Sequence, residues 1–129
     1  MSPRRGDVVR VRLDPVVGSE QAGERPALVL SPDLINHHSP VILVAALTSR
    51  KSDRIYPFEA LVEPPEGGLR HRSKVLLMQL RAIDKRRVID TMGRVSQGTM
   101  RRVDEALRIA TGLTPTSSQK ADFGPHDIL

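Results

Sequence analysis

The sequence predicts a mainly β domain with helices (α+β class): a small β-barrel of short strands on which one C-terminal helix packs. Three observations favour this class. Short apolar segments of strand type recur along the first 95 residues, clusters of turn-forming residues separate them, and the one long segment with helical spacing comes last. Many short strands followed by a late helix are typical of small barrels with a covering helix.

The first half of the chain contains three predicted strands. Apolar and polar side chains alternate over residues 7–13, as in a strand with one buried face. A short apolar strand follows at 26–30, and residues 33–39 can form one helical turn. Residues 41–48 are the most continuous apolar run, which predicts a strand covered on both faces.

The second half contains further short strands, and each is bounded by turn residues. They are predicted at residues 56–62, 73–80, 81–83 and 87–95, with turns at 64–68 and 84–86. A helix follows, with Ser96 as its N-cap and Gly112 at its C-terminal cap. Its apolar face consists of Met100, Val103, Leu107 and Ala110.

Length and composition predict one domain and a tail. Residues 1–113 form the predicted domain, whereas residues 114–129 are polar and without periodicity. The 129 residues include no cysteine, which excludes thiolate chemistry. The longest apolar run, 41–47, is much shorter than a membrane span or a signal sequence. We therefore expect a soluble, cytoplasmic protein with no membrane association.

The chain is basic, with a formal net charge of +5. Such a surface suits a polyanionic partner, although a merely soluble basic domain has the same composition. Aromatic residues are scarce: one tyrosine, two phenylalanines and no tryptophan. Because base stacking needs aromatic faces, an RNA-binding role would rest on contacts to phosphates and base edges.

The histidines give no metal-binding pattern, and no cofactor motif is present, so we expect neither a metal nor a cofactor. His71 lies in the basic run 70–74, where one histidine of an acid–base pair would suit a nuclease. Nothing in the sequence places a second histidine beside it. A solvated loop that contacts phosphates is the favoured interpretation.

Two strand ends are candidate sites. Arg25 ends a glycine-rich loop and precedes Pro26, so its backbone is extended and its guanidinium is available to a phosphate. The alternative is a salt bridge from Arg25 to Glu20 or Glu24. Thr48 ends the most apolar strand, before hydroxyl and cationic side chains, but this is also how ordinary strands end.

Three segments together carry a family resemblance. The stretches Gly6-Asp7-Val8-Val9, Gly18-Ser19-Glu20-Gln21-Ala22-Gly23-Glu24-Arg25-Pro26 and Ser73-Lys74-Val75-Leu76-Leu77-Met78-Gln79-Leu80-Arg81-Ala82-Ile83-Asp84 are similar to the signature of the MazF/PemK toxins. The resemblance extends over residues 4–113. It implies an SH3-like barrel that forms a homodimer and belongs to a type II toxin–antitoxin system. It also implies a cognate antitoxin that blocks the RNA groove with an acidic C-terminal segment.

The resemblance further implies a reaction and a set of residues. Members cleave single-stranded RNA at short motifs, without ribosome or metal, leaving a 2′,3′-cyclic phosphate and a 5′-hydroxyl. The catalytic positions fall on Arg25 and Thr48. The positions expected to contact RNA are Ser19, Glu20, Ser49, Ser73 and Gln79. Two alternatives stay open: a non-catalytic relative that binds DNA gyrase, and a degenerate homologue that only binds an antitoxin.

Overall fold

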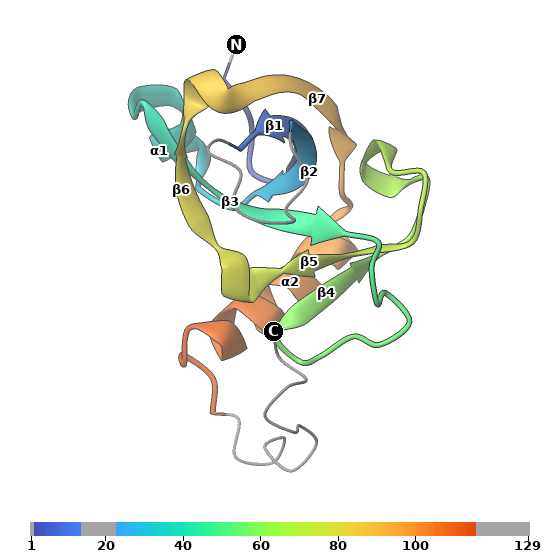
Figure 1. Cartoon of the computed structure of the whole chain (residues 1–129). Coiled ribbons are helices and arrows are strands. Elements are labelled where there is room, and N and C mark those ends of the chain that lie inside the picture. Colours follow the sequence, from blue (N-terminus) through green and yellow to red (C-terminus); the bar gives the residue numbers. More distant parts are fainter. Residues whose placement is uncertain (1, 14–22, 116–129) are drawn as a thin grey trace.

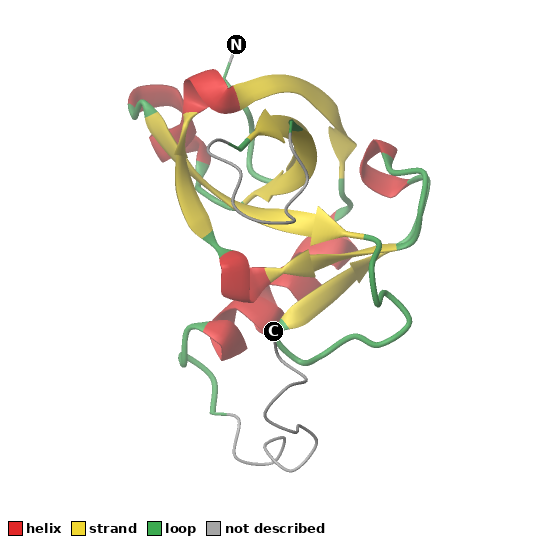
Figure 2. Cartoon of the chain, in the orientation of Figure 1, coloured by secondary structure: helices red, strands yellow, loops and turns green. Residues whose placement is uncertain are grey.

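The structure is a computed structural model of the chain and describes residues 2–13 and 23–115. Figure 2 shows that strands dominate the described part. The strands are β1 (Asp7–Arg12), β2 (Glu24–Val29), β3 (Val41–Thr48), β4 (Glu59–Val62), β5 (Ser73–Leu76), β6 (Arg81–Asp84) and β7 (Val88–Arg94). The helices are α1 (Asp33–His38) and α2 (Gln97–Ala110), with short 3-10 helices η1 (Glu66–Gly68), η2 (Leu77–Gln79) and η3 (Lys85–Arg87).

The strands form one curved antiparallel sheet. Its order is β4-β5-β3-β2-β1-β7, and β6 pairs with β3 beside this path. β6 and β7 are joined through η3 and wrap around β1 and β2 (Figure 1). Two register shifts between β1 and β7 increase the local bend. The predicted fold class is confirmed, and among the described strands no hydrogen-bonded pair of β4 and β7 closes the barrel.

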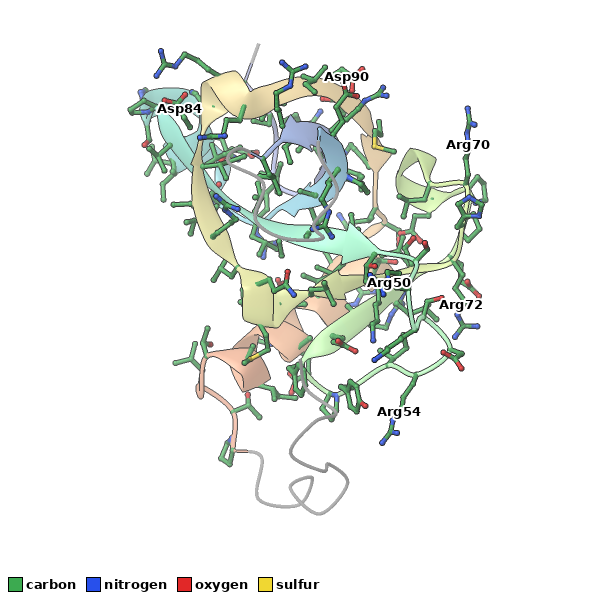
Figure 3. All side chains as sticks on the ribbon, viewed as in Figure 1. Arg50, Arg54, Arg70, Arg72, Asp84 and Asp90 are labelled. Atoms are coloured by element: carbon green, nitrogen blue, oxygen red, sulfur yellow. The ribbon has the colours of Figure 1, made fainter. Side chains whose placement is uncertain are left out.

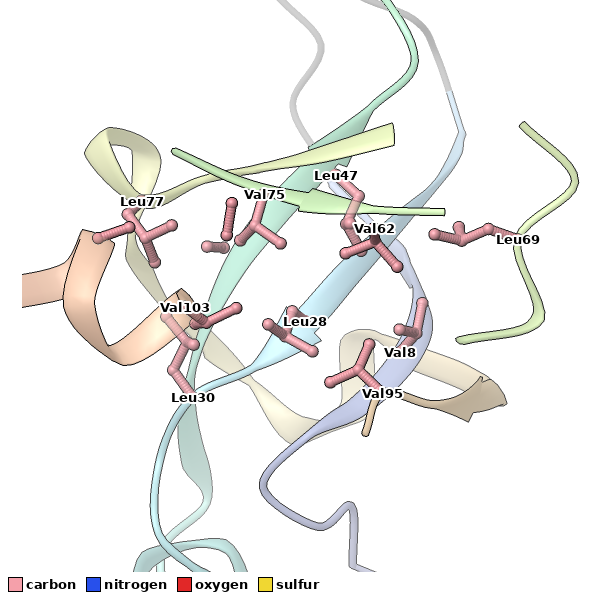
Figure 4. Close-up of a cluster of buried hydrophobic side chains, with 13 residues drawn as sticks. Val8, Leu28, Leu30, Leu47, Val62, Leu69, Val75, Leu77, Val95 and Val103 are labelled. Atoms are coloured by element: carbon pink, nitrogen blue, oxygen red, sulfur yellow. The ribbon is translucent and has the colours of Figure 1, made fainter. Parts of the chain in front are cut away.

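The curved sheet has an apolar core on each face. Successive side chains of a strand point to opposite faces, so the neighbours Val8 and Val9 enter different clusters. The first cluster lies between the sheet and α2 and includes Leu28, Leu47 and Val103 (Figure 4). The second lies on the inner side of the curve and consists of Val9, Val11, Ala27, Val29, Ile42, Val44 and Ile83.

β3 has its predicted bounds, but the prediction that both faces are covered is wrong for its first half. Val41 and Leu43 are exposed, whereas Ile42 between them is buried. From Val44 onward both faces are covered, because Leu47 packs in the first cluster and Val44 in the second. A continuous apolar run shows that a strand is central in a sheet, but it does not show where the covering layer ends.

The C-terminal helix forms as predicted. The Ser96 hydroxyl accepts a hydrogen bond from the Thr99 N–H at 3.1 Å, and Gly112 ends the helix with a φ of 79°. Val103 and Ala106 are fully buried against the sheet. Neither α1 nor α2, the two α-helices of the described residues, is long and apolar enough to cross a membrane.

Candidate active site

An open groove with a volume of about 890 Å³ lies where β2 begins and β3 ends. Side chains of β1, β7 and the loops around η1 and β5 complete its walls. It is lined by Arg10, Arg25, Pro26, Leu47, Thr48, Ser49, Arg50, Gly68, Leu69, Arg70, His71, Ser73, Thr91 and Met92. The groove therefore brings together both strand ends that the sequence marked as candidate sites.

The register of the sheet explains why Arg25 and Thr48 meet in this groove. Ala27 pairs with Ala46 across β2 and β3. The paired part of β2 and β3 ends there, and Arg25 and Thr48 each lie two residues further along their strand. Side chains of directly opposed residues stand on the same face of the sheet, about 5 Å apart at their Cβ atoms. Arg25 and Thr48 thus line the same groove from the neighbouring strands β2 and β3.

The Thr48 hydroxyl is held in place by the loop that follows it. Its Oγ1 accepts a hydrogen bond from the Arg50 N–H at 3.1 Å. A hydroxyl that accepts one bond still has its own proton to donate. Thr48 is half-buried and Ser49 and Arg50 are exposed, so this donor sits at the border between core and solvent.

The charge of the groove is positive. Four arginines line it (Arg10, Arg25, Arg50 and Arg70), and no aspartate or glutamate does so among the described residues. Arg10 is hydrogen-bonded to Asp90 at 2.8 Å, and this bond together with the charge of Asp90 raises the pKa of Arg10. The other three guanidinium groups have no ion-pair partner within residues 2–13 and 23–115.

The structure shows no salt bridge from Arg25 to Glu24. Glu24 instead lies 3.7 Å from Arg10 and 3.8 Å from Arg12, on the outer face of β1 and β2. Adjacent residues of a strand point to opposite faces, which separates the Glu24 carboxylate from the Arg25 guanidinium. Glu20, the other partner considered, lies outside the described residues.

The predicted RNA-contacting residues are distributed unevenly. Ser49 and Ser73 line the groove, and the Ser73 hydroxyl donates to the His71 carbonyl at 2.9 Å. Gln79 lies in η2, beyond the opposite end of β5, and is not a lining residue. Ser19 and Glu20 lie outside the described part of the chain.

Several lining residues were not singled out from the sequence. Arg10 belongs to the outer face of β1, which the alternation in residues 7–13 already indicated. Thr91 and Met92 come from β7, which pairs with β1 and so reaches the same edge. His71, interpreted as part of a solvated loop, is exposed and lines the groove. Only the pairing of β1 with β7 reveals the contribution of Thr91 and Met92.

A cationic rim lies along one side of the groove. Figure 3 shows Arg50, Arg54, Arg70 and Arg72 on one side of the molecule, around the ends of β3 and β5. Arg72 joins two loops of this rim, because its Nε donates to the Ser52 carbonyl at 3.1 Å. The rim extends the positive potential of the groove outward, as expected of a surface that tracks a phosphate backbone.

The wall formed by η1 rests on a carboxylate. Glu66 accepts a hydrogen bond from the Ser96 N–H at 2.7 Å, which ties η1 to the start of α2. Partial burial opposes ionisation of Glu66, but hydrogen bonds from Thr99 and Ser96 and the charge of Arg102 outweigh it. The net effect lowers the pKa of Glu66. The ionised form therefore stabilises the fold.

This predicts a stability difference that depends on pH. A carboxyl group with a lowered folded-state pKa contributes fully above its ordinary value of 4.5, and the contribution is lost as pH falls through the folded value. At pH 7 we expect Glu66→Gln to cost about 1 kcal/mol, allowing for solvent screening. The difference from wild type should shrink below pH 4.5 in urea unfolding. A difference that is constant with pH would contradict this role of Glu66.

The fold and the groove together define a class of protein: a small basic β-sheet domain with an open site for a polyanion, lined by an arginine and a threonine from neighbouring strands. The family model for the "PemK-like, MazF-like toxin of type II toxin-antitoxin system" matches residues 4–111. The chain belongs to this toxin family. This confirms the resemblance found in the sequence.

Individual relatives agree with this assignment. Endoribonuclease EndoA of Bacillus subtilis is 41% identical over 113 residues, which span 88% of this chain and 97% of EndoA. The crystal structure of MazF from Deinococcus radiodurans is 31% identical, with a TM-score of 0.70 over 87% of this chain and 98% of its own. An endoribonuclease from a mycobacterial species in complex with its cognate antitoxin is 26% identical, with a TM-score of 0.72 over 88% and 99%.

Proposed function

We propose that this chain is the toxin of a type II toxin–antitoxin system and a sequence-specific endoribonuclease that cleaves single-stranded RNA. The proposal rests on family membership and on the endoribonuclease EndoA as a relative over nearly its whole length. One observation of the structure supports it most directly. Arg25 and Thr48, on neighbouring strands, line one groove whose described lining holds four arginines and no aspartate or glutamate.

The proposed reaction is an intramolecular transesterification. The ribose 2′-oxygen attacks the adjacent phosphorus, a 2′-O–P bond forms, and the P–O5′ bond breaks. The 2′-hydroxyl loses its proton and the 5′-oxygen gains one, leaving a 2′,3′-cyclic phosphate and a 5′-hydroxyl. Negative charge increases on the phosphoryl oxygens in the five-coordinate transition state. Fixed donors aimed at those oxygens stabilise this state more than the ground state.

Arg25 and Thr48 have the properties that this step needs. The guanidinium carries a permanent charge and two parallel donors that match phosphate oxygens. The Thr48 hydroxyl, fixed by the Arg50 N–H, donates a second hydrogen bond. Both residues stand on strands of the sheet, which fix their backbones before substrate arrives and so limit the reorganisation needed in the reaction. We assign both an electrostatic role.

Recognition of RNA is proposed to rest on hydrogen bonds rather than stacking. Tyrosine, phenylalanine and tryptophan are absent from the described lining, whereas Ser49 and Ser73 offer hydroxyl groups. Ser19, Glu20 and Gln79 stay proposed RNA contacts, although Gln79 lies away from the groove in this chain. RNA would reach Gln79 only by continuing past the described lining.

We also propose the partners that the family implies. An antitoxin with an acidic C-terminal segment suits a groove in which three arginines are unpaired among the described residues. A homodimer is proposed as the active form, and its mass can be measured by analytical ultracentrifugation. Residues 1–113 are the proposed catalytic domain, and 114–129 the tail.

The deciding experiment incubates the purified protein with long single-stranded RNA, with and without EDTA, and determines fragment ends by mass spectrometry. We expect cuts in both conditions, with cyclic phosphate and 5′-hydroxyl ends. Thr48→Ala should lower the rate about 10²-fold or more, whereas Thr48→Ser keeps the hydroxyl and most of the rate. Intact RNA with binding to gyrase, or with binding only to an acidic peptide, would favour the two alternative functions.

RNA affinity is expected to fall steeply with salt. With Arg25, Arg50 and Arg70 contacting phosphates, log Kd against log salt should have a slope of about 2, from about 0.7 per contact on single strands. Arg70→Gln should lower this slope by about 0.7. Arg101→Gln, on the exposed face of α2, should not change it. A slope near zero would show that these cations do not bind phosphate.

A further inference from the structure

The most deeply buried cation of the described residues lies directly behind the groove. Lys74 of β5 is 4% exposed, although lysine is rarely buried without a partner. The neighbouring residue Ser73 lines the groove, and the backbone of Lys74 pairs with Thr48 of β3. The side chain of Lys74 itself is not a lining residue. The proposed chemistry does not use it.

The described partners of the Lys74 ammonium lie in the second half of one loop and on the first residue of β4. Nζ donates to Glu59 Oε1 at 2.8 Å and to the Arg54 carbonyl at 3.0 Å. It also lies 5.4 Å from the ring centroid of Tyr56, which stacks on Phe58. The Glu59 carboxylate in turn accepts the Tyr56 N–H at 3.0 Å. This network fixes the chain just before β4.

The loop in question is 49–58, which connects β3 to β4 and begins with the groove residues Ser49 and Arg50. Lys74 holds both of its ends. The backbone of Lys74 fixes the start of the loop through Thr48, and its ammonium fixes the other end through Glu59 and the Arg54 carbonyl. A loop anchored at both ends has few conformations, so groups on it lose little entropy when a ligand binds.

Stability alone does not account for this pair. A buried ion pair is often replaced by apolar residues of similar size without loss of stability, because desolvation of two charges offsets their attraction. The Lys74 and Glu59 side chains are only 5% and 7% exposed, so both are desolvated. What an apolar pair would not supply is the bond from Nζ to the Arg54 carbonyl.

We propose that Lys74 is a positioning residue of the groove. Its ammonium anchors loop 49–58 and so pre-organises Ser49 and Arg50 for a phosphate-bearing strand. The inference rests on the proposed RNA-cleaving function for its ligand, but the anchoring itself is independent of activity. Loss of the anchor should weaken binding of RNA and leave the chemical step at Arg25 and Thr48 nearly unchanged.

The test uses Lys74→Met combined with Glu59→Gln. The double variant leaves no buried charge, and the amide oxygen introduced at position 59 would still accept the Tyr56 N–H, so the fold is preserved. The two bonds from Nζ and its contact with the Tyr56 ring are lost. The matched control is Arg94→Met combined with Asp7→Asn: there the cation also bonds a carboxylate and a backbone carbonyl, and the carboxylate also accepts a backbone N–H. Neither residue of the control lines the groove.

Three quantities are measured: amide hydrogen exchange, KM and kcat for RNA cleavage, and Kd for fully 2′-O-methylated single-stranded RNA, which lacks the nucleophile. For the Lys74 and Glu59 variant we expect faster exchange in 49–58 but not in α2. KM and Kd should rise about tenfold, as when two side chains must be ordered on binding, with kcat within about twofold. The control should keep wild-type KM and exchange in 49–58.

Unchanged exchange in 49–58, or unchanged Kd despite faster exchange, would overturn the positioning role. A fall in kcat with unchanged KM would do so as well. If the wild type binds 2′-O-methylated RNA but does not cleave unmodified RNA, the proposed catalytic function fails. Hydrogen exchange and Kd then still decide whether Lys74 has the positioning role. Lys74→Met alone leaves the Glu59 charge unpaired and is expected to lower stability more than the double variant.

Discussion

Arg25→Ala is expected to lower kcat for RNA cleavage about 10³-fold or more, the effect seen when an arginine that neutralises a phosphoryl transition state is removed. KM should change much less, because the substrate phosphate is also held by other cations of the groove. Stability should change by less than about 0.5 kcal/mol, since no residue of the described ranges pairs with the guanidinium. Single-turnover cleavage and urea unfolding measure the two effects.

Arg25→Lys is the matched control for this prediction. It keeps the positive charge and loses the planar pair of donors. If geometry matters as well as charge, its kcat should lie between those of wild type and Arg25→Ala. An Arg25→Ala protein that cleaves RNA at the wild-type rate would show that this side chain takes no part in the reaction.

The largest expected effect on stability is that of Gly68→Ala. Gly68 ends η1 with a φ of +72°, and a Cβ added there would lie 2.2 Å from the backbone oxygen of Met92 in β7. Neither backbone can move without breaking the contact between η1 and β7. We expect a loss of about 3–4 kcal/mol, the sum of a left-handed backbone and a steric clash, measured by urea unfolding. The groove should be disturbed too, because Gly68 and Met92 both line it.

Gly112→Ala separates strain from clash. Gly112 has a similar φ of +79°, but nothing lies within 4 Å of an added Cβ. Its substitution should therefore cost only about 1 kcal/mol, the conformational part. If both variants lose the same amount of unfolding free energy, η1 must shift away from the Met92 oxygen at no cost. The close approach of Gly68 to Met92 would then not contribute to stability.

Much of the fold could be predicted from local patterns. Alternation located β1, the N-cap and the C-terminal glycine located α2, and turn residues separated the strands. Two strands were predicted too long. β4 begins only at Glu59, because the Tyr56 N–H bonds the Glu59 side chain, and β5 ends at Leu76, where η2 begins. Side-chain bonds and short 3-10 turns do not alter hydrophobic periodicity, so the pattern does not reveal them.

The site could be predicted only in part. The polar and cationic residues at the strand ends near Arg25 and Thr48 indicate candidate sites, and the family resemblance implies their catalytic roles. Their convergence depends on the register between β2 and β3, which no local pattern fixes. The contribution of β7 and the anchoring by Lys74 depend on contacts between segments far apart in the sequence. Such contacts follow from the three-dimensional arrangement of the strands.

Because β3 supplies side chains to the apolar clusters on both faces of the sheet, we expect neither cluster to unfold while the other stays folded. Unfolding of the described domain should thus be a single cooperative event. Thr48 ends this shared strand, so warming should not produce a folded but catalytically disordered intermediate. Activity and tertiary structure should disappear together.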